Sequence, residues 1–163
     1  QLFVLPEVKL FGKTVSSSAI REALTLGNMT EANEMLGRPY FVKGKVCHGK
    51  SLGHVLGFPT VNLDFEEGRE IPKRGVYFGE CTLHGKTYPV AASIGVRPTV
   101  EKGETKPRLE AHIIGFEGDL YGKEIKIEFI EKIRDEVKFD SVEDLKKQLS
   151  LDVGFCKKRF YER

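Results

Sequence analysis

Alternation of apolar and polar residues with a period of two is the feature of this 163-residue chain that most restricts its fold. Apolar side chains occupy every second position around Val42 and Val46, and again from Ile125 to Phe129. Such alternation is typical of strands with one buried face. Most of these runs are joined by short turns that leave no room for the crossover helices of a parallel sheet. We therefore expect a mainly β protein, a six-stranded antiparallel closed barrel with strands at about 40–48, 60–65, 75–84, 87–95, 108–116 and 124–131.

Helical spacing of apolar residues is confined to the two ends of the chain. One short helix is predicted between Ser16 and Gly27, and a second one ends at Gly37. Near the other end, Ser141 and Asp144 form a capping box, which predicts the start of a long helix. We expect this helix to cover an open side of the barrel with an apolar stripe made of Val142, Leu145, Leu149, Val153, Cys156 and Phe160.

The charged residues argue against two classes of partner. The 26 basic and 24 acidic residues are interspersed and give a net charge of +2, so no one-sided basic field is predicted for nucleic acid or an anionic membrane. No apolar run approaches the length of a membrane span.

The cysteines Cys47, Cys81 and Cys156 form no C-x-x-C pair, which favours packed thiols in a reducing compartment. We expect a cytoplasmic protein, and the opening QLFVLPEV suggests a piece of a longer one.

The string GKVCHGKS, from Gly44 to Ser51, fits the phosphate-loop pattern G-x-x-x-x-G-K-[ST]. A true phosphate loop runs directly into the N-terminus of a helix. Here Gly53, Gly57 and Pro59 follow closely, and glycine and proline cost about 1 and about 3 kcal/mol in a helix interior. The sequence therefore predicts a different fold, and leaves open where a phosphate would bind.

The segment GFPTVNL offers a candidate metal site. On a strand, Thr60 and Asn62 project from the same face and present a hydroxyl and an amide oxygen. Mg²⁺ with few protein ligands takes its remaining oxygens from water and substrate phosphates, so this pair suits a metal that arrives with ATP. The alternative is an ordinary polar strand face, and the spacing alone favours that plainer interpretation.

Glu110, in the segment LEAHIIGFEGDLYGKEI, is a candidate general base. Alternation places it on one face with His112, Ile114 and Phe116, where neighbouring apolar groups would raise the basicity of its carboxylate by desolvation. The alternative is a solvated glutamate on the outer wall of the barrel. Taken by itself, Glu110 favours this plainer interpretation. Asp119, Tyr121 and Gly122 lie in a turn between strands, and simple turn chemistry also explains them.

The ordered motifs between Arg38 and Arg134 carry a resemblance. They read GRPY, G-x-V-x-H-G, LGFPTVNL, P-x-x-GVY, SIGVRPT, LEAHI, F-x-GDLYGK and IR-x-E-x-KF. In this order they resemble the riboflavin kinase module of the bifunctional bacterial FAD synthetases (riboflavin kinase/FMN adenylyltransferase). The resemblance covers about three quarters of the chain. It implies a six-stranded antiparallel barrel with a C-terminal helix, and transfer of phosphate from Mg·ATP to riboflavin to give FMN and ADP.

The resemblance also assigns roles to residues. Thr60 and Asn62 correspond to the threonine and asparagine that bind Mg·ATP, and Glu110 to the base for the ribityl 5′-hydroxyl. Three residues depart from the usual pattern, namely Val61, His54 and Ser93. Val61 should point away from the metal face, and His54 replaces an arginine that the resemblance implies as a phosphate contact. We assign no consequence to Ser93. We read His48 and His54 as loop residues rather than zinc ligands. The phosphate-binding loop implied by the resemblance includes Gly44, His48, Gly49, Lys50, Gly53 and Gly57, and the turn with Asp119, Tyr121 and Gly122 is expected to border the flavin together with the C-terminal helix.

The segment VSSSAIREAL resembles the end of the FMN adenylyltransferase module. Ser16, Ser17 and Arg21 match its ATP-binding motif, with Ser18 in place of threonine. We therefore expect residues 1–38 to be a helical remnant and linker, and residues 39–163 to be the kinase barrel.

The expected partners are ATP, riboflavin, the missing part of the adenylyltransferase module and, as a further candidate, a second copy of the chain. Because most of that module is absent from these 163 residues, we expect no FAD from this chain alone. Two rival functions are also compatible with a barrel. A non-catalytic flavin-binding or regulatory barrel would not need Glu110, and an oligonucleotide-binding barrel would need aromatic and basic residues interleaved on an exposed sheet.

Overall fold

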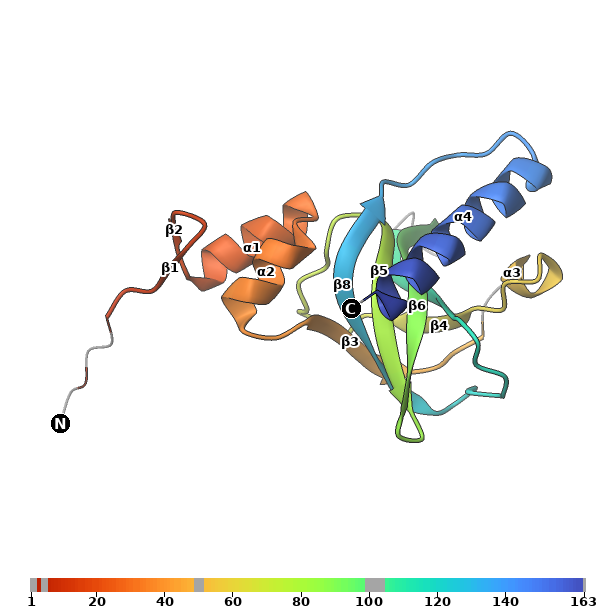
Figure 1. The fold of residues 1–163 in the computed structure, drawn as a ribbon, viewed down its shortest axis with the longest axis horizontal. Coiled ribbons are helices and arrows are strands. Elements are labelled where there is room, and N and C mark those ends of the chain that lie inside the picture. Colours follow the sequence, from red (N-terminus) through yellow and green to blue (C-terminus); the bar gives the residue numbers. More distant parts are fainter. Residues whose placement is uncertain (1–2, 4–5, 49–51, 99–104, 163) are drawn as a thin grey trace.

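The computed structural model describes residues 3, 6–48, 52–98 and 105–162. Its centre is a six-stranded sheet in the order β3-β8-β5-β6-β7-β4, with every described pairing antiparallel. The sheet curls into a barrel that is nearly closed (Figure 1). The fold predicted from the alternation is thereby confirmed. The strands are β3 (Tyr40–Lys45), β4 (Val61–Asp64), β5 (Gly75–Leu83), β6 (Lys86–Pro98), β7 (Thr105–Ile113) and β8 (Glu124–Arg134).

The seam of the barrel lies between β3 and β4, the two edge strands of the sheet. One isolated antiparallel bridge joins Cys47 to Asn62, where the Cys47 N–H donates to the Asn62 carbonyl over 2.9 Å. Gly44 lies at this seam, because a Cβ on it would stand 3.4 Å from the Leu63 side chain. The lack of a side chain at Gly44 therefore allows the two edges to approach.

β6 and β8 are longer than the alternation predicted. β6 reaches Pro98 and β8 reaches Arg134 because backbone pairing with β7 and β5 continues beyond the apolar positions. The chain after β8 starts at one end of the barrel, where Val76 of β5 pairs with Arg134. This extension matters for the site, since it places Arg134 beside the C-terminal helix.

The N-terminal helices share the core of the barrel. A small pair of strands, β1 (Lys9–Leu10) and β2 (Lys13–Thr14), precedes α1 (Ser17–Leu26) and α2 (Met29–Leu36). Leu24, Met29 and Ala32 are buried in one apolar cluster with residues of all six barrel strands. The Asn33 side chain donates to the Phe129 carbonyl over 2.8 Å and accepts from the Tyr40 N–H over 2.7 Å. The two helices therefore pack on one side of the barrel as a continuation of its core (Figure 1).

The C-terminal helix α4 (Val142–Tyr161) lies across β5 and β6 (Figure 1). Ser141 caps it, and its hydroxyl accepts from the Asp144 N–H over 3.0 Å, as predicted. The predicted stripe is wrong at Val142, whose side chain is exposed because the first turn of α4 projects beyond the sheet. The helix instead buries Asp152, a charged residue that the apolar pattern did not indicate.

The phosphate-loop string is followed by one short turn of helix, α3 (Leu52–Val55). This turn ends at Gly57, whose φ of 85° is a left-handed conformation that favours glycine. α3 leads into an antiparallel strand, so the arrangement is not that of a phosphate-loop hydrolase. None of the helices that the structure describes combines the length and the apolar character needed to cross a membrane.

Candidate functional site

A cavity of about 240 Å³ lies between the outer face of the barrel and α4. We call it the helix-side cavity. One of its walls is apolar and comes from α4, with Leu145, Leu149 and Val153. The opposite wall, formed by the strands, carries polar groups that include Thr60 and Glu110. An apolar slot with a few polar groups at one end is typical of a site for a flat organic molecule.

A second cavity, of about 460 Å³, lies where the barrel meets its loops. We call it the loop-side cavity. It is more polar, and its walls come from the residues that follow β3, the start of β4 with the residues before it, and the turn between β7 and β8. Residues that represent these walls are Cys47, His48, Thr60, Asn62, Asp119 and Tyr121.

Thr60 lines both cavities. It directly precedes β4, and His112 of β7 fixes this segment through a 2.7 Å hydrogen bond between its Nδ1 and the Pro59 carbonyl. Gly53 packs so closely against the same segment that a Cβ on it would stand 2.4 Å from the Phe58 carbonyl oxygen. The chain therefore holds Thr60 at the point where the two cavities meet.

Asn62 and Glu110 are direct cross-strand partners in the register of β4 and β7. Residues opposite each other in an antiparallel pair project from the same face, with Cβ atoms about 5 Å apart. Val61, between Thr60 and Asn62, packs instead against the core, as expected. The pairing thus brings Asn62, which lines the loop-side cavity, next to Glu110, which lines the helix-side cavity.

The Asn62 side chain fits a hard metal ion. The residue is 4% exposed, and its buried Oδ1 has no hydrogen-bond partner. A buried amide oxygen without a partner is costly, so its retention points to a ligand that the protein itself does not supply. Within the described residues no group of three His, Cys, Asp or Glu side chains could hold a metal alone. The donor set is therefore suited to Mg²⁺ that takes most of its ligands from water and phosphate oxygens.

His48 and Tyr121 form part of the wall of the loop-side cavity. Their rings stack with centroids 3.7 Å apart. Asp119 shapes the turn, because its Oδ1 accepts from the Tyr121 N–H over 2.8 Å. Gly122 connects the turn to the segment that follows β3, because its N–H donates to the Val46 carbonyl over 3.0 Å. The turn that was expected to border the flavin thus faces the loop-side cavity, with the exception of Gly122.

The glycines of the expected phosphate loop divide into several groups. Gly44 lies at the barrel seam and lines neither of the two cavities. Gly53 lines the helix-side cavity, and Gly57 ends the turn that follows α3. Gly49 and Lys50 lie outside the described residues.

The N-terminal residues that match the adenylyltransferase motif have structural contacts here. Ser16 caps α1, and its hydroxyl accepts from the Ala19 N–H over 3.2 Å. Arg21 lies 3.6 Å from the carboxylate of Glu70, on the loop between β4 and β5. Ser17 and Ser18 lie in the first turn of α1.

Glu110 is exposed, so the apolar surroundings that were expected to desolvate its carboxylate do not cover it in this structure. The reason is that its neighbours on that face belong to an open cavity wall rather than to a closed core. Ser93 of β6 is the cross-strand partner of Glu110 and lines the same cavity. This residue, which departs from the usual pattern, therefore lies in the candidate site.

Glu136 is a site residue that the alternation pattern missed. It lies after β8, outside any strand, and lines the helix-side cavity together with Glu110. Its carboxylate sits over Gly95, where an added Cβ would stand 2.7 Å from Glu136 Oε1. The only signals in the sequence were the motifs SIGVRPT and IR-x-E-x-KF, which contain these two residues.

His112 makes folding stability depend on pH. Burial lowers its pKa below the ordinary value of 6.5, and the charge of Lys157 acts in the same direction. Just below pH 6.5 the unfolded chain binds a proton that the folded protein does not.

The free energy of unfolding should therefore fall as the pH decreases below 6.5, and the substitution His112→Asn should make that fall shallower. Urea unfolding at several pH values measures it, with His84→Asn in the exposed β5–β6 turn as control. Equal slopes for wild type and His112→Asn would contradict the assignment.

The three cysteines differ in environment. Burial raises the pKa of Cys81 to about 11 and that of Cys156 to about 12, as expected of packed thiols. Cys47 is only half-buried and lines the loop-side cavity, where the Arg108 guanidinium lies 3.1 Å from its sulfur. The prediction of packed thiols is therefore wrong for Cys47.

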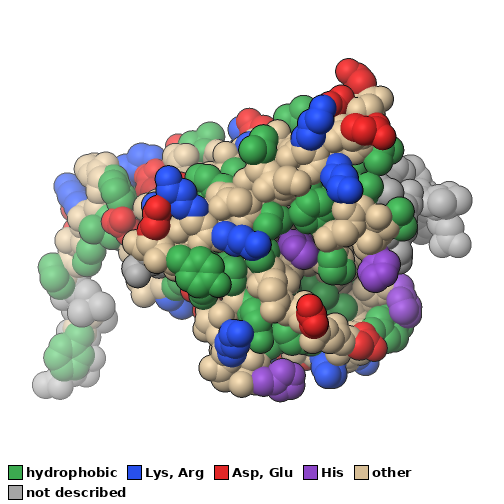
Figure 2. Space-filling model, turned by 45° about the vertical axis from the view of Figure 1, so that its right-hand side comes forward, with side chains coloured by type: hydrophobic (Ala, Val, Ile, Leu, Met, Phe, Trp, Pro, Cys, Tyr) green, Lys and Arg blue, Asp and Glu red, His purple; other side chains and the backbone are tan. Residues whose placement is uncertain are grey.

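Basic side chains are scattered over the face seen in Figure 2 and form no continuous stripe there. Histidine and hydrophobic side chains are interspersed between them. This face does not have the basic, aromatic-lined track of an oligonucleotide-binding surface.

Comparison with known proteins gives consistent sequence matches. A family model for riboflavin kinase (Flavokinase) matches residues 36–160. The bifunctional riboflavin kinase/FMN adenylyltransferase of Pseudomonas fluorescens is 41% identical over 147 residues, which cover 90% of this chain and 47% of that protein. The protein of the same name in Bacillus subtilis (strain 168) is 40% identical over 141 residues, covering 86% of this chain and 45% of the relative. The chain thus spans about half the length of the curated relatives it matches.

Solved structures share the fold. A crystal structure described as a macrolide-efflux protein from Streptococcus pneumoniae has a TM-score of 0.86 and 34% identity, and the match covers 94% of this chain and 50% of that one. The riboflavin kinase of Trypanosoma brucei has a TM-score of 0.54 and 28% identity, with coverage of 76% and 80%.

Proposed function

Because the chain belongs to the riboflavin kinase family, we propose that it transfers the terminal phosphoryl group of ATP to the ribityl 5′-hydroxyl of riboflavin, giving FMN and ADP. The observation that carries this proposal is the position of Thr60 in the walls of both cavities. A phosphoryl transfer needs a nucleotide and an acceptor to approach each other in line, and adjoining cavities that share one wall suit this requirement.

In this proposal the loop-side cavity takes ATP and the helix-side cavity takes the flavin ring. The polar walls of the first suit a nucleotide, and the apolar wall of the second, with Leu145 and Leu149, suits an isoalloxazine ring. The turn with Asp119 and Tyr121 then borders the nucleotide, in contrast to the flavin contact expected from the sequence. The ribityl chain would extend past Thr60 toward the terminal phosphate.

Thr60 and Asn62 would hold Mg²⁺ through their side-chain oxygens. The metal would neutralise charge on the transferred phosphoryl group. Glu110 would accept the proton of the 5′-hydroxyl, because it lies next to Asn62 across β4 and β7. Its carboxylate is open to solvent in this structure, so the bound flavin itself would provide the desolvating cover.

We further propose that the chain is part of a bifunctional protein, since its relatives are named bifunctional riboflavin kinase/FMN adenylyltransferases. We also propose that it works in the cytoplasm. Residues 1–38 would then be the link to an adenylyltransferase module, with residues 39–163 as the kinase barrel. The proposed kinase is preferred to a non-catalytic flavin-binding barrel, since a carboxylate beside a metal-suited asparagine serves transfer and is not needed for binding alone.

The test supplies riboflavin and Mg·ATP to the purified chain and follows FMN and ADP by chromatography. We expect equal amounts of FMN and ADP, and no FMN when a chelator removes Mg²⁺. Riboflavin binding without any release of ADP would reject the kinase and favour the non-catalytic barrel.

A further inference from the structure

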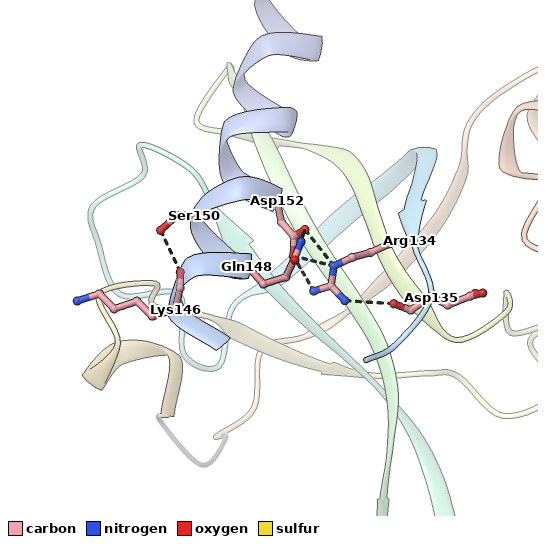
Figure 3. Close-up of polar contacts among 6 residues, drawn as sticks. All are labelled: Arg134, Asp135, Lys146, Gln148, Ser150 and Asp152. Carbon is pink, nitrogen blue, oxygen red and sulfur yellow. Dashed lines mark hydrogen bonds and ion pairs between the residues drawn. The ribbon is translucent and has the colours of Figure 1, made fainter. Parts of the chain in front are cut away.

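A buried ion pair joins α4 to the end of β8. Arg134 donates from Nη2 to Asp152 Oδ2 over 2.7 Å and from Nε to Oδ1 over 3.0 Å (Figure 3). Gln148, one turn earlier on α4, donates to the same Oδ1 over 2.9 Å. Asp152 is 2% exposed, so its carboxylate is almost entirely surrounded by protein. The paired, two-point geometry fixes both the distance and the orientation between helix and strand.

Arg134 also contacts the segment that connects β8 to α4, residues 135–141. Its Nη1 donates to the Asp135 carbonyl over 3.1 Å (Figure 3), and its guanidinium lies 5.9 Å from the centre of the Phe139 ring. One side chain therefore touches the start of this segment, a residue near its end and the helix that follows it.

The elements joined by this arginine form one side of the helix-side cavity. Glu136, Val137 and Phe139 of the connecting segment line it, as do Leu145 and Leu149 of α4. The two residues of the ion pair, Arg134 and Asp152, border the same cavity. The first turn of α4 projects beyond the sheet, so this part of the helix extends past the strands. A second ion pair between α4 and β8, Arg159 with Glu131 at 2.8 Å, is more exposed and lies outside the lining of this cavity.

A buried ion pair is a poor means of stabilising a fold. Desolvation of the two charges offsets most of their attraction, and apolar residues of similar size often serve stability equally well. In some proteins such a pair instead specifies the relative position of the two elements that it joins. The side of α4 that faces the sheet otherwise packs through side chains such as Val153, Cys156 and Phe160. Such contacts are not directional, so they specify the position of the helix relative to the strands less strictly.

We propose that Arg134 and Asp152 are positioning residues for the flavin half of the site. They hold α4 and residues 135–141 as a fixed wall of the helix-side cavity, and they set its affinity for the flavin without acting on the nucleotide. This inference rests on the proposed assignment of that cavity to riboflavin.

The test compares Asp152→Asn and Arg134→Lys with Lys147→Gln, which breaks an exposed ion pair on the same helix. Asp152→Asn keeps the size of the side chain but removes its charge, whereas Arg134→Lys keeps the charge and loses the two-point geometry. We expect Asp152→Asn to raise the KM and Kd for riboflavin by about 10- to 100-fold, because small displacements of a positioning wall have effects of this size. Arg134→Lys should have a smaller effect. In all three variants the Kd for Mg·ADP should stay within about twofold of wild type, well below the tenfold that 1.4 kcal/mol represents.

Two results would overturn the proposal: a riboflavin constant close to that of wild type in folded Asp152→Asn, or an equal change in the Mg·ADP constant. If the single variants do not fold, the double variant Arg134→Met with Asp152→Leu restores apolar packing. A double variant with wild-type riboflavin affinity shows that the pair only stabilises the fold and rejects the proposal. A raised KM in the folded double variant supports it.

Amide hydrogen exchange separates this inference from the proposed function. Asp152→Asn should speed exchange in residues 135–149 relative to β5 and β6, and Lys147→Gln should not. If the wild type phosphorylates no riboflavin, the kinase assignment fails, while faster exchange still supports the fixed wall and unchanged exchange rejects it.

Discussion

Glu110→Gln is expected to lower the single-turnover rate of FMN formation by about 10²- to 10⁴-fold, the range that a positioned general base contributes. Glutamine keeps the size of the side chain and its capacity for hydrogen bonds, but it cannot accept the proton of the ribityl hydroxyl. Because Glu110 is exposed on a cavity wall, the substitution should leave the fold unchanged. Binding of riboflavin and of Mg·ATP, measured by titration, should therefore remain close to wild type.

The matched control is Glu136→Gln, since Glu136 is another carboxylate in the lining of the helix-side cavity and lies outside the ion pair of Asp152. It should reduce the rate much less than Glu110→Gln. If Glu110→Gln keeps more than about a third of wild-type turnover, where base catalysis contributes at least ~10²-fold, Glu110 is not the base. A large loss in Glu136→Gln alone would then transfer the role to that residue.

Asn62→Ala is expected to lower kcat/KM for Mg·ATP by about 100-fold or more. Loss of a residue that only hydrogen-bonds to a metal ligand already lowers metal affinity or activity by about 10- to 100-fold, and Asn62 is proposed as a ligand itself. The physical reason is the buried Oδ1, which has no partner in the protein and is suited to a metal ion. Riboflavin binding should change little, because Asn62 lines the loop-side cavity only.

Asn62→Asp is the informative companion, because it retains an oxygen donor of similar size. It should recover metal-dependent turnover that the alanine variant loses, with a changed dependence on Mg²⁺ concentration. Circular dichroism checks that both proteins are folded. Equal losses of Mg·ATP use and riboflavin binding in folded Asn62→Ala would count against the metal assignment.

The sequence by itself determined the six barrel strands and the three longer helices, apart from the positions of some of their ends. Strands with one buried face impose a period of two, so the alternating positions of Val42 in β3 and of Ile125 and Phe129 in β8 were enough to predict these two strands. The cap at Ser141 predicted the start of α4, because capping depends on residues close in sequence. The prediction that Thr60 and Asn62 share a strand face used the same local geometry, although Thr60 lies just before β4.

The tertiary structure decided which residues meet. Strand register, which no local pattern shows, places Asn62 opposite Glu110, and the packing of α4 converts an exposed strand face into a cavity wall. Burial of Asp152 contradicts the apolar stripe of its helix, since its partner Arg134 lies 18 residues away at the end of a strand. The position of Thr60 between two cavities likewise depends on β4, β7 and α4 together. Local periodicity specifies the faces of single elements, whereas contacts between elements distant in sequence build the site.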